Sequence, residues 1–317
     1  MKYAVISGTG SYIPEKQLSN VELESMIDTS DEWIASRTGI RNRSIAQGHE
    51  TTSYMAAKAA EQALLAANLD ADLIDLIIVA TCTPDNFFPS VACAVQHALK
   101  IKNPIPAFDV SAACSGFVYV MDIAKQYISS GAANNILVIG SERMSHALDW
   151  NDRATCVLFG DGAGAVVLSA STRQGVIGSV LHSSYDREKF LDLPNNSLKE
   201  ERSVISMKGN DVFKLAVNIM GNVVDEVLEL SQLKKSDIKW LVPHQANQRI
   251  IQAIAKKLEL PMSQVIVTIG NHGNTSAASI PLALDHSIRN NQIQKDDLFL
   301  IEAFGAGMTW GAMVIRY

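Results

Sequence analysis

Three residues of the chain have types and settings that suit nucleophilic chemistry. Cys114 follows a short apolar run and several small residues, and it precedes a stretch with helical character. A thiol at the start of a helix faces free backbone N–H groups, which stabilise the thiolate and lower the pKa of the cysteine. His244 and Asn274 lie in polar motifs further along the chain. We interpret the three as a nucleophile with two polar helpers.

The segments around these residues alternate short apolar runs with longer helical periods. Runs typical of buried strands cover 73–80, 136–140, 163–168, 238–242 and 297–303. Helical periods cover 51–67, 117–130, 212–230 and 245–258. This order predicts an α/β fold whose sheets are covered by helices.

Parts of the two halves of the chain resemble each other. The strand at 74–80 resembles 238–244, and the strand at 136–139 resembles 298–301. Two similar halves, 1–170 and 171–317, would bring their matching loops together, so that Cys114, His244 and Asn274 share one cleft. Such spacing also arises by chance in α/β chains, and spacing alone leaves both interpretations open.

Composition narrows the class of protein. The chain has 317 residues, of which 47% are hydrophobic, and a formal net charge of −6. It can bury a large core, and it carries no overall basic field for nucleic acid. No apolar run is long enough to span a bilayer, and the first residues resemble a strand rather than a signal peptide. Four cysteines without Cys-x-x-Cys spacing are too few for a disulfide scaffold. We therefore expect a cytoplasmic protein that binds neither nucleic acid nor membrane.

Six motifs carry a more specific signal. In order along the chain they are Asp28–Ile34, Arg37–Arg41, Ala112–Gly116, Phe159–Ala165, His244–Asn247 and His272–Ala278. In type and order they resemble the β-ketoacyl-acyl carrier protein synthase III family, thiolase-fold enzymes that start bacterial fatty-acid synthesis. The resemblance runs essentially from end to end. It implies a homodimer of five-layered αβαβα subunits made of two similar halves, in agreement with the duplicated α/β pattern.

The resemblance also implies a reaction. Cys114 would take an acyl group from a primer acyl-CoA, with acetyl-CoA expected, while backbone N–H groups of Cys114 and of the loop with Ala306 and Gly307 hold the oxyanion. Malonyl-acyl carrier protein would then lose CO₂, and His244 and Asn274 would donate hydrogen bonds to the resulting enolate. Attack on acyl-Cys114 would give 3-oxoacyl-acyl carrier protein. No metal or redox cofactor is implied.

Recognition residues follow from the same resemblance. The positions that match the family's site for the CoA adenine and phosphates are Thr29, Trp33, Arg37 and Arg153. The positions that match the region meeting the acidic carrier protein are Lys214, Arg249, Lys256 and Lys257. For any single lysine, a solvated helix face is the ordinary interpretation. Phe88 resembles an aromatic residue that reaches into the partner subunit's acyl pocket, although a phenylalanine is more often part of the core.

One departure from the family pattern affects the primer. Many members carry three glycines where this chain has Gly305-Ala306-Gly307. The added methyl group of Ala306, with Met308 as an adaptable wall, leaves the size of the primer open. A related condensing enzyme of secondary metabolism, which uses longer or unusual acyl-CoA, is therefore the alternative.

Other classes fit less well. A thiolase needs a second cysteine in its C-terminal half, where this chain has none. A hydroxymethylglutaryl-CoA synthase would carry a glutamate near 80–83, and an inactive acyl-binding module would not need Cys114, His244 and Asn274 together.

Several other features are interpreted as structural. The glycines of Gly8–Gly10 and Gly160–Gly164 lack the full pattern of a nucleotide-binding loop, and we predict turns there. Cys82, Cys93 and Cys156 are predicted to be packing residues, and His272 is expected to support the loop before Asn274.

Overall fold

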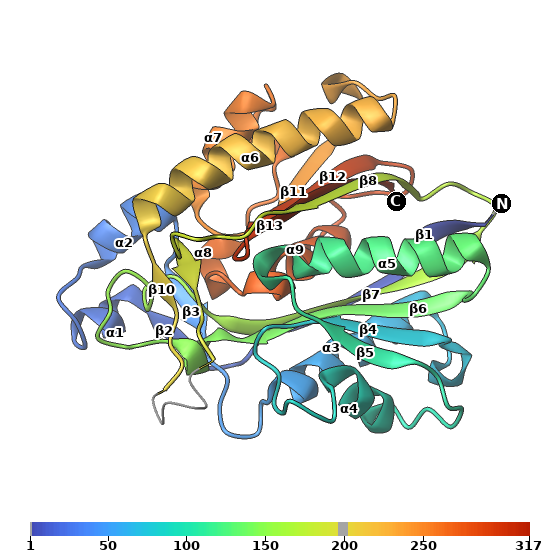
Figure 1. Ribbon diagram of the computed structural model, residues 1–317, viewed down its shortest axis with the longest axis horizontal. Coiled ribbons are helices and arrows are strands. Elements are labelled where there is room, and N and C mark those ends of the chain that lie inside the picture. The colour runs from blue at the N-terminus through green and yellow to red at the C-terminus, as the bar shows by residue number, and fades with distance from the viewer. Residues whose placement is uncertain (1, 196–201) are drawn as a thin grey trace.

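Five layers make up the computed structural model, which describes residues 2–195 and 202–317. Helix, sheet, helix, sheet and helix follow one another from the bottom to the top of Figure 1. The lower sheet has the strand order β1-β7-β6-β4-β5. Its strands are β1 (Tyr3–Tyr12), β7 (Asp161–Ser171), β6 (Asn135–Arg143), β4 (Leu76–Ala80) and β5 (Ala107–Val110).

The upper sheet repeats this arrangement. Its order is β11-β12-β13-β8, formed by β11 (Trp240–Pro243), β12 (Leu298–Gly305), β13 (Thr309–Arg316) and β8 (Val176–Ser183). In both sheets a parallel pair, β4 with β6 or β11 with β12, is followed by two antiparallel neighbours. The place of β5 is represented in the upper sheet by a single parallel bridge between Leu241 and Val265. The topology is therefore that of a duplicated unit.

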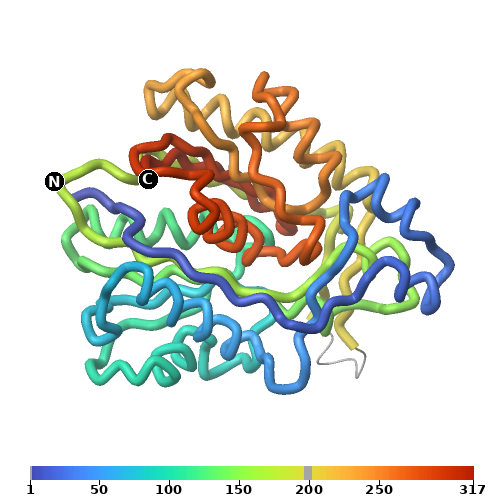
Figure 2. The backbone as a smooth tube through the Cα atoms, turned by 180° about the vertical axis from the view of Figure 1, so that it is seen from behind, coloured from blue at the N-terminus to red at the C-terminus, as the bar shows by residue number. Residues whose placement is uncertain are grey.

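Helices cover every face of the two sheets. The outer face of the lower sheet packs against α3 (Thr52–Ala67) and α4 (Val91–Ala98), and the outer face of the upper sheet against α6 (Gly209–Leu230) and α7 (Gln248–Lys257). Between the sheets lie α5 (Gly116–Ser130) and α9 (Ser279–Arg289), whose apolar side chains join both sheets in one core. Figure 2 shows β1 running beneath the C-terminal segments, with both termini at the same end of the molecule.

Short elements cap one end of the layers and build a further cluster of buried side chains. They are β2 (Gln17–Ser19), α1 (Asn20–Glu24), α2 (Asp31–Thr38), β3 (Asn42–Ser44), β9 (Leu191–Asp192), β10 (Ser206–Met207) and α8 (Ile269–His272). The start of α2 is fixed by Ser30, whose hydroxyl accepts a hydrogen bond from Trp33 N at 3.1 Å. This cap sets the position of the Trp33 indole.

Except for Gly160, which precedes β7, the glycines of the two segments lie in strands, so the prediction of turns is wrong for them. Gly8 and Gly10 belong to β1, and Gly162 and Gly164 belong to β7. A Cβ atom at Gly10 would lie 2.3 Å from the carbonyl oxygen of Ala59 in α3. The absent side chains let the helices pack closely on the sheet, a reason for glycine within a strand that a turn pattern does not reveal.

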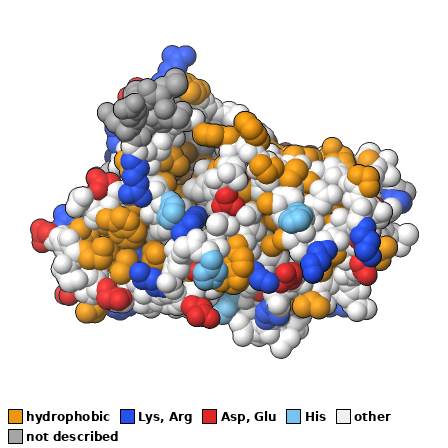
Figure 3. Space-filling model, turned by 90° about the horizontal axis from the view of Figure 1, so that it is seen from below, with side chains coloured by type: hydrophobic (Ala, Val, Ile, Leu, Met, Phe, Trp, Pro, Cys, Tyr) orange, Lys and Arg blue, Asp and Glu red, His pale blue; other side chains and the backbone are white. Residues whose placement is uncertain are grey.

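The predicted α/β fold of five layers with two similar halves is confirmed. The division at residue 170 stays a prediction; β7 ends at Ser171 and β8 begins at Val176. Within the described ranges, no helix has the length and apolar character needed to cross a membrane. On the face that carries α3 and α4, side chains of both charges are mixed with apolar groups, and no uniformly basic area is visible (Figure 3).

Candidate active site

Cys114 lies where β5 gives way to α5, in the 3₁₀ turn η2 (Ala113–Ser115). Ala113 adopts a left-handed backbone with φ of 45°, which turns the chain sharply before the thiol. Gly305, at the end of β12, lies directly behind: a Cβ atom there would be 2.7 Å from Cys114 N. Cys114 is thus held between the two halves, and only 6% of it is exposed.

The expected lowering of the thiol pKa is wrong. Burial raises the pKa of Cys114 to about 12, and the nearby Glu142 carboxylate adds to the rise. The hydroxyl of Ser276 and the backbone N–H of Cys114 act in the opposite direction but do not outweigh burial. The start of a helix favours a thiolate, yet removal from water costs the charged form more. Cys114 is therefore a protonated thiol in the ligand-free protein.

His244 follows β11 directly. Its backbone N–H donates to the carbonyl of Glu302 in β12 at 2.8 Å, which fixes the histidine at the end of the upper sheet. Its Nδ1 lies 2.6 Å from the hydroxyl oxygen of Ser279 in α9. Burial lowers the pKa of His244 to about 3, so the imidazole is neutral.

Asn274 is held by backbone hydrogen bonds on both sides. Its N–H donates to Leu158 O at 2.8 Å, and its carbonyl accepts from Gly160 N at 3.0 Å. The side-chain Oδ1 accepts from Ser276 N at 2.9 Å. Because the oxygen end of the amide is occupied in this way, the NH₂ group is the end that can serve a substrate.

A cavity of about 250 Å³ brings the three residues together. Its wall includes Cys114, His244 and Asn274, as expected from matching loops of two halves. Trp33, Arg37, Arg153 and Arg249 line the same cavity. A thiol, an imidazole, an amide and several cations therefore share one space.

Two arginines cover the Trp33 ring at the outer part of this cavity. The guanidinium carbons of Arg37 and Arg153 lie 4.7 and 4.8 Å from the ring centroid, within the range of cation–π contacts. Arg153 also donates to Asp28 O at 2.8 Å. Thr29 is not on the cavity wall, and its buried hydroxyl has no hydrogen-bond partner among the residues that the structure describes.

Cys114 also borders a second cavity of about 500 Å³ on its other side. Ala306 and Gly307 line this cavity, as do the residues Cys82, Met144, Phe159, Ile205 and Ser276. Met308 does not line it: the side chain is buried in the core beneath α6, so its predicted role as a wall is wrong. The thiol thus borders two spaces. The first contains Trp33 and several arginines, and the second is lined by apolar side chains together with Asp186, Lys189 and Asp192.

The environment of Cys82 differs from the predicted packing role. Its thiol donates to Glu142 Oε1 at 3.2 Å, and this carboxylate also accepts from Thr83 Oγ1 and Thr81 Oγ1. Burial raises the pKa of Glu142. Cys82 therefore lines the 500 Å³ cavity beside Cys114 and is hydrogen-bonded to the buried carboxylate of Glu142.

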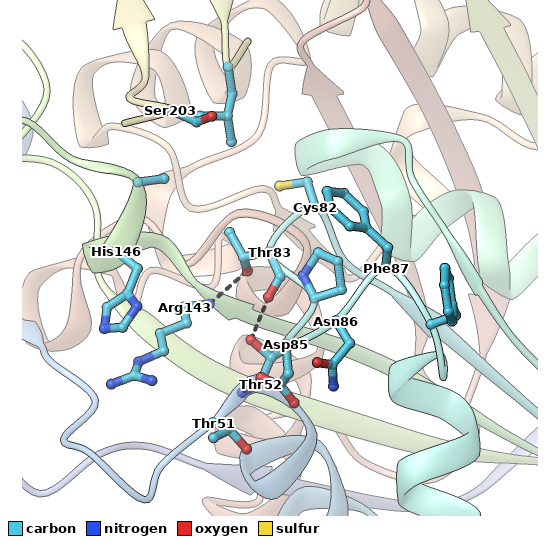
Figure 4. Close-up of a pocket in the computed structure, with 14 residues that line it drawn as sticks. Thr51, Thr52, Cys82, Thr83, Asp85, Asn86, Phe87, Arg143, His146 and Ser203 are labelled. Atoms are coloured by element: carbon cyan, nitrogen blue, oxygen red, sulfur yellow. Dashed lines mark hydrogen bonds between the residues drawn. The ribbon is translucent and has the colours of Figure 1, made fainter. Parts of the chain in front are cut away.

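A third cavity, of about 750 Å³, adjoins the second one at Cys82 (Figure 4). Thr83 anchors its floor: its carbonyl accepts from Thr52 Oγ1 at 2.6 Å and its hydroxyl from Arg143 N at 2.9 Å. Phe88 lies on this wall and is 86% exposed, and Phe87 is 82% exposed. Phe88 is thus neither part of the core nor on the wall of the two cavities that Cys114 borders.

The predicted carrier-protein residues lie on α6 and α7, side by side at the top of Figure 1. Lys214, Arg249, Lys256 and Lys257 are all exposed. Arg249 also reaches the 250 Å³ cavity and lies 5.7 Å from the ring centroid of Phe213. Lys257 donates to Asn222 Oδ1 at 2.8 Å, which ties the two helices together.

Structural roles were also predicted for Cys156, Cys93 and His272, and the structure agrees with some of these predictions but not all. Cys156 is buried in the capping cluster, as predicted, whereas Cys93 is exposed on α4 and the packing prediction is wrong. His272 is buried, with Nδ1 at 2.9 Å from Gly273 O and Nε2 at 3.1 Å from Thr268 Oγ1. Both ring nitrogens are used within the loop, which fits the expected support of Asn274.

Sequence reasoning missed Ser276 and Ser279. Both are buried, and they contact Asn274 and His244 respectively. Ser276 belongs to the motif that ends at Ala278, so its position was visible in the sequence, but serine in a small-residue run indicates a tight turn as readily as a functional group.

Comparison with known proteins bears on this geometry. Residues 108–184 match the family model for 3-Oxoacyl-[acyl-carrier-protein (ACP)] synthase III, and residues 228–317 match the model for its C-terminal part. The chain is 53% identical over 323 residues to a Beta-ketoacyl-[acyl-carrier-protein] synthase III from Alkalilimnicola ehrlichii, covering 100% of both proteins. These matches include the segments of Cys114, His244 and Asn274.

The chain belongs to the β-ketoacyl-acyl carrier protein synthase III family. Like the proteins of this family it is an acyltransferase of fatty-acid synthesis. Its fold is that of the synthase III crystal structure from Aquifex aeolicus, with a TM-score of 0.95 and 49% identity over 99% of this chain and 100% of that one.

The alternative function is not favoured. A priming β-ketosynthase from the R1128 polyketide pathway has the same fold, with a TM-score of 0.95, but is 36% identical over 99% of this chain and 96% of that one. Identity to the synthase III of Alkalilimnicola ehrlichii is 53%.

Proposed function

We propose that the protein condenses a primer acyl-CoA, acetyl-CoA foremost, with malonyl-acyl carrier protein through an acyl-Cys114 intermediate. The observation that carries the proposal is the position of Cys114 between two cavities. One contains His244 and Asn274 and opens toward Trp33 and the arginines, and the other offers space for the acyl group. A thioester that crosses this junction presents its carbonyl carbon to the thiol.

Acyl transfer begins with a neutral nucleophile. The sulfur of Cys114 attacks the thioester carbonyl, the bond to the CoA sulfur breaks, and the proton of the thiol ends on that sulfur. Backbone N–H groups of Cys114 and of the Ala306–Gly307 loop would stabilise the developing oxyanion. The closeness of Gly305 to Cys114 N brings this loop to the nucleophile.

Condensation uses the two polar groups. When the malonyl thioester loses CO₂, negative charge collects on its thioester oxygen, and a neutral imidazole and an amide NH₂ can donate to it without themselves carrying charge. The pKa of His244, lowered to about 3 by burial, keeps the ring neutral throughout the physiological range. The carbanion then attacks the carbonyl of acyl-Cys114, the thiolate of Cys114 leaves, and 3-oxoacyl-acyl carrier protein forms. We expect no cofactor, since these groups supply each step.

Substrate recognition is assigned to Trp33 and the cationic side chains near the 250 Å³ cavity and on α6 and α7. Trp33, Arg37 and Arg153 would bind the adenine and phosphates of CoA. For the adenine to stack on the indole of Trp33, one of the two arginines would have to move off that face of the ring. Thr29 would act only from outside the cavity wall. The exposed cations on α6 and α7, Lys214, Arg249, Lys256 and Lys257, would meet the acidic carrier protein.

A homodimer would complete the site. β5 lies at the edge of the lower sheet, and the neighbouring Phe87 and Phe88 expose most of their surface. Pairing of two β5 edges would cover these side chains and allow Phe88 to approach the partner's acyl pocket.

Four free cysteines suit a reducing compartment such as the cytoplasm.

Intact-protein mass spectrometry after mixing with acyl-CoA of increasing length tests the proposal. We expect an acetyl adduct on the wild type and none on Cys114→Ala. An adduct only with longer or unusual acyl groups would shift the function to the related condensing enzyme. No adduct with any acyl-CoA would overturn the proposal.

A further inference from the structure

Ser279 lies at the first turn of α9 and contacts the imidazole of His244 from behind. Its hydroxyl oxygen is 2.6 Å from His244 Nδ1 and accepts a hydrogen bond from Gln245 N at 3.3 Å. Ser279 is fully buried, with 0% of its surface exposed. No water can therefore serve as an alternative partner for this hydroxyl without displacing packed side chains.

The direction of the bond to His244 follows from the partners of the hydroxyl. A serine hydroxyl has one proton to donate and lone pairs to accept with. Gln245 N–H already donates to one lone pair. Among the residues that the structure describes, Nδ1 of His244 is the only acceptor within hydrogen-bond distance of the Ser279 hydroxyl. If Nδ1 carried the proton, the buried hydroxyl would donate to nothing, an arrangement that folded proteins avoid.

We propose that Ser279 is a positioning residue that fixes the tautomer of His244, with the proton on Nε2 and the lone pair on Nδ1. The inference rests on the proposed function and deepens it, because it decides what His244 can do. In this tautomer the free nitrogen of the ring presents an N–H, so His244 enters the reaction as a hydrogen-bond donor.

The tautomer has consequences for both steps of the reaction. A protonated Nε2 cannot take the proton of the Cys114 thiol, so His244 does not serve as the base in acyl transfer. It can donate to the thioester oxygen on which charge gathers when CO₂ leaves. The side-chain amide of Asn274 is likewise oriented as a donor. Ser276 N–H donates to its Oδ1, so its NH₂ group is left to donate. Two buried side chains are thereby oriented as a pair of donors by Ser276, in the 3₁₀ turn Ser276–Ala278, and by Ser279, the first residue of α9.

The first test reads the tautomer directly. In wild-type protein labelled with ¹⁵N-histidine, the two ring nitrogens of His244 give separate NMR signals, which His244→Gln assigns by their loss. The proposal predicts a protonated Nε2 and an unprotonated Nδ1 near pH 7. A protonated Nδ1 would overturn it. This readout needs no substrate and stands whether or not the protein condenses acyl-CoA.

The second test uses Ser279→Ala, with Ser287→Ala as the matched control. Ser287 is also a buried serine of α9, but its hydroxyl donates to Leu284 O, away from His244. Loss of one fixed oxyanion donor costs roughly 10²- to 10³-fold. Because the ring of Ser279→Ala still samples the donor tautomer, we expect condensation to fall about 10- to 100-fold at unchanged acylation of Cys114. Ser279→Thr, which keeps the hydroxyl, should restore most of the rate.

The outcomes separate the inference from the proposed function. Equal condensation rates for Ser279→Ala and wild type, or equal loss of both half-reactions, would overturn the role of Ser279. A wild-type protein that shows the predicted tautomer but no reaction with acyl-CoA and malonyl-acyl carrier protein would overturn the proposed function alone.

Discussion

The alkylation of Cys114 should rise steeply with pH and show no plateau in the neutral range. Burial places the pKa of this thiol at about 12. Only the thiolate reacts with iodoacetamide, so the fraction of reactive sulfur at pH 7 is about 10⁻⁵ and grows tenfold with each pH unit. Between pH 7 and pH 10 the rate constant should therefore increase about 10³-fold.

A thiol governed by the start of the helix would behave differently. Cysteines in that setting have pKa values of roughly 3.5–7.5, so their alkylation rate levels off by about pH 8.5 at the latest. The two accounts thus differ by orders of magnitude in the slope above pH 7. The slope therefore shows whether burial or the helix start controls the pKa of Cys114.

The assay follows carboxamidomethylation of Cys114 by peptide mass spectrometry. Cys93→Ser serves as the background, because Cys93 is exposed and would consume reagent. If the alkylation rate were flat between pH 7 and pH 9, burial would not set the pKa of Cys114.

Three further changes have defined effects. Trp33→Ala should raise KM for acyl-CoA by about 5- to 150-fold, since stacking of a base on an aromatic ring is worth roughly 1–3 kcal/mol. With an acyl-pantetheine, which lacks the adenine, the variant and the wild type should have the same steady-state kinetics. Gly10→Ala should lower the free energy of unfolding in urea by about 1–3 kcal/mol, because the methyl group would meet the backbone of α3. Gly48→Ala, where nothing lies within 4 Å of the added Cβ, is its control, and equal stability of the two variants would contradict the close packing. Lys256→Glu should raise KM for malonyl-acyl carrier protein several-fold in a salt-dependent manner and leave acylation by acyl-CoA unchanged, whereas an effect on both would place Lys256 outside the carrier-protein surface.

The sequence predicted the architecture well because it is repeated and strongly periodic. The strands β4 and β11 and the helices α3 and α5 lie close to the ranges expected from apolar periodicity. The meeting of Cys114, His244 and Asn274 followed from the matching positions of two halves. Such long-range placement is accessible from sequence when one unit occurs twice.

The features that sequence reasoning missed depend on contacts between residues that are far apart in the sequence. Glycines within β1 are needed because α3 passes over them, and no local pattern contains that information. The thiol pKa depends on how completely Cys114 is removed from water, which the helix start does not indicate. Met308 directly follows Gly307, which lines the 500 Å³ cavity, yet the side chain of Met308 turns into the core beneath α6. The contact of Ser279 with His244 joins residues that are 35 positions apart.

We propose that Cys114 carries the acyl group and that His244 and Asn274 act only in decarboxylation and condensation. Half-reactions of His244→Ala and Asn274→Ala measure these roles separately. Formation of acetyl-Cys114 from acetyl-CoA is followed by intact mass, and decarboxylation of malonyl-acyl carrier protein by release of ¹⁴CO₂. We expect both variants to acylate Cys114 and to fail in decarboxylation. If both variants lost acylation to the extent seen in Cys114→Ala, the proposed roles of His244 and Asn274 would be wrong.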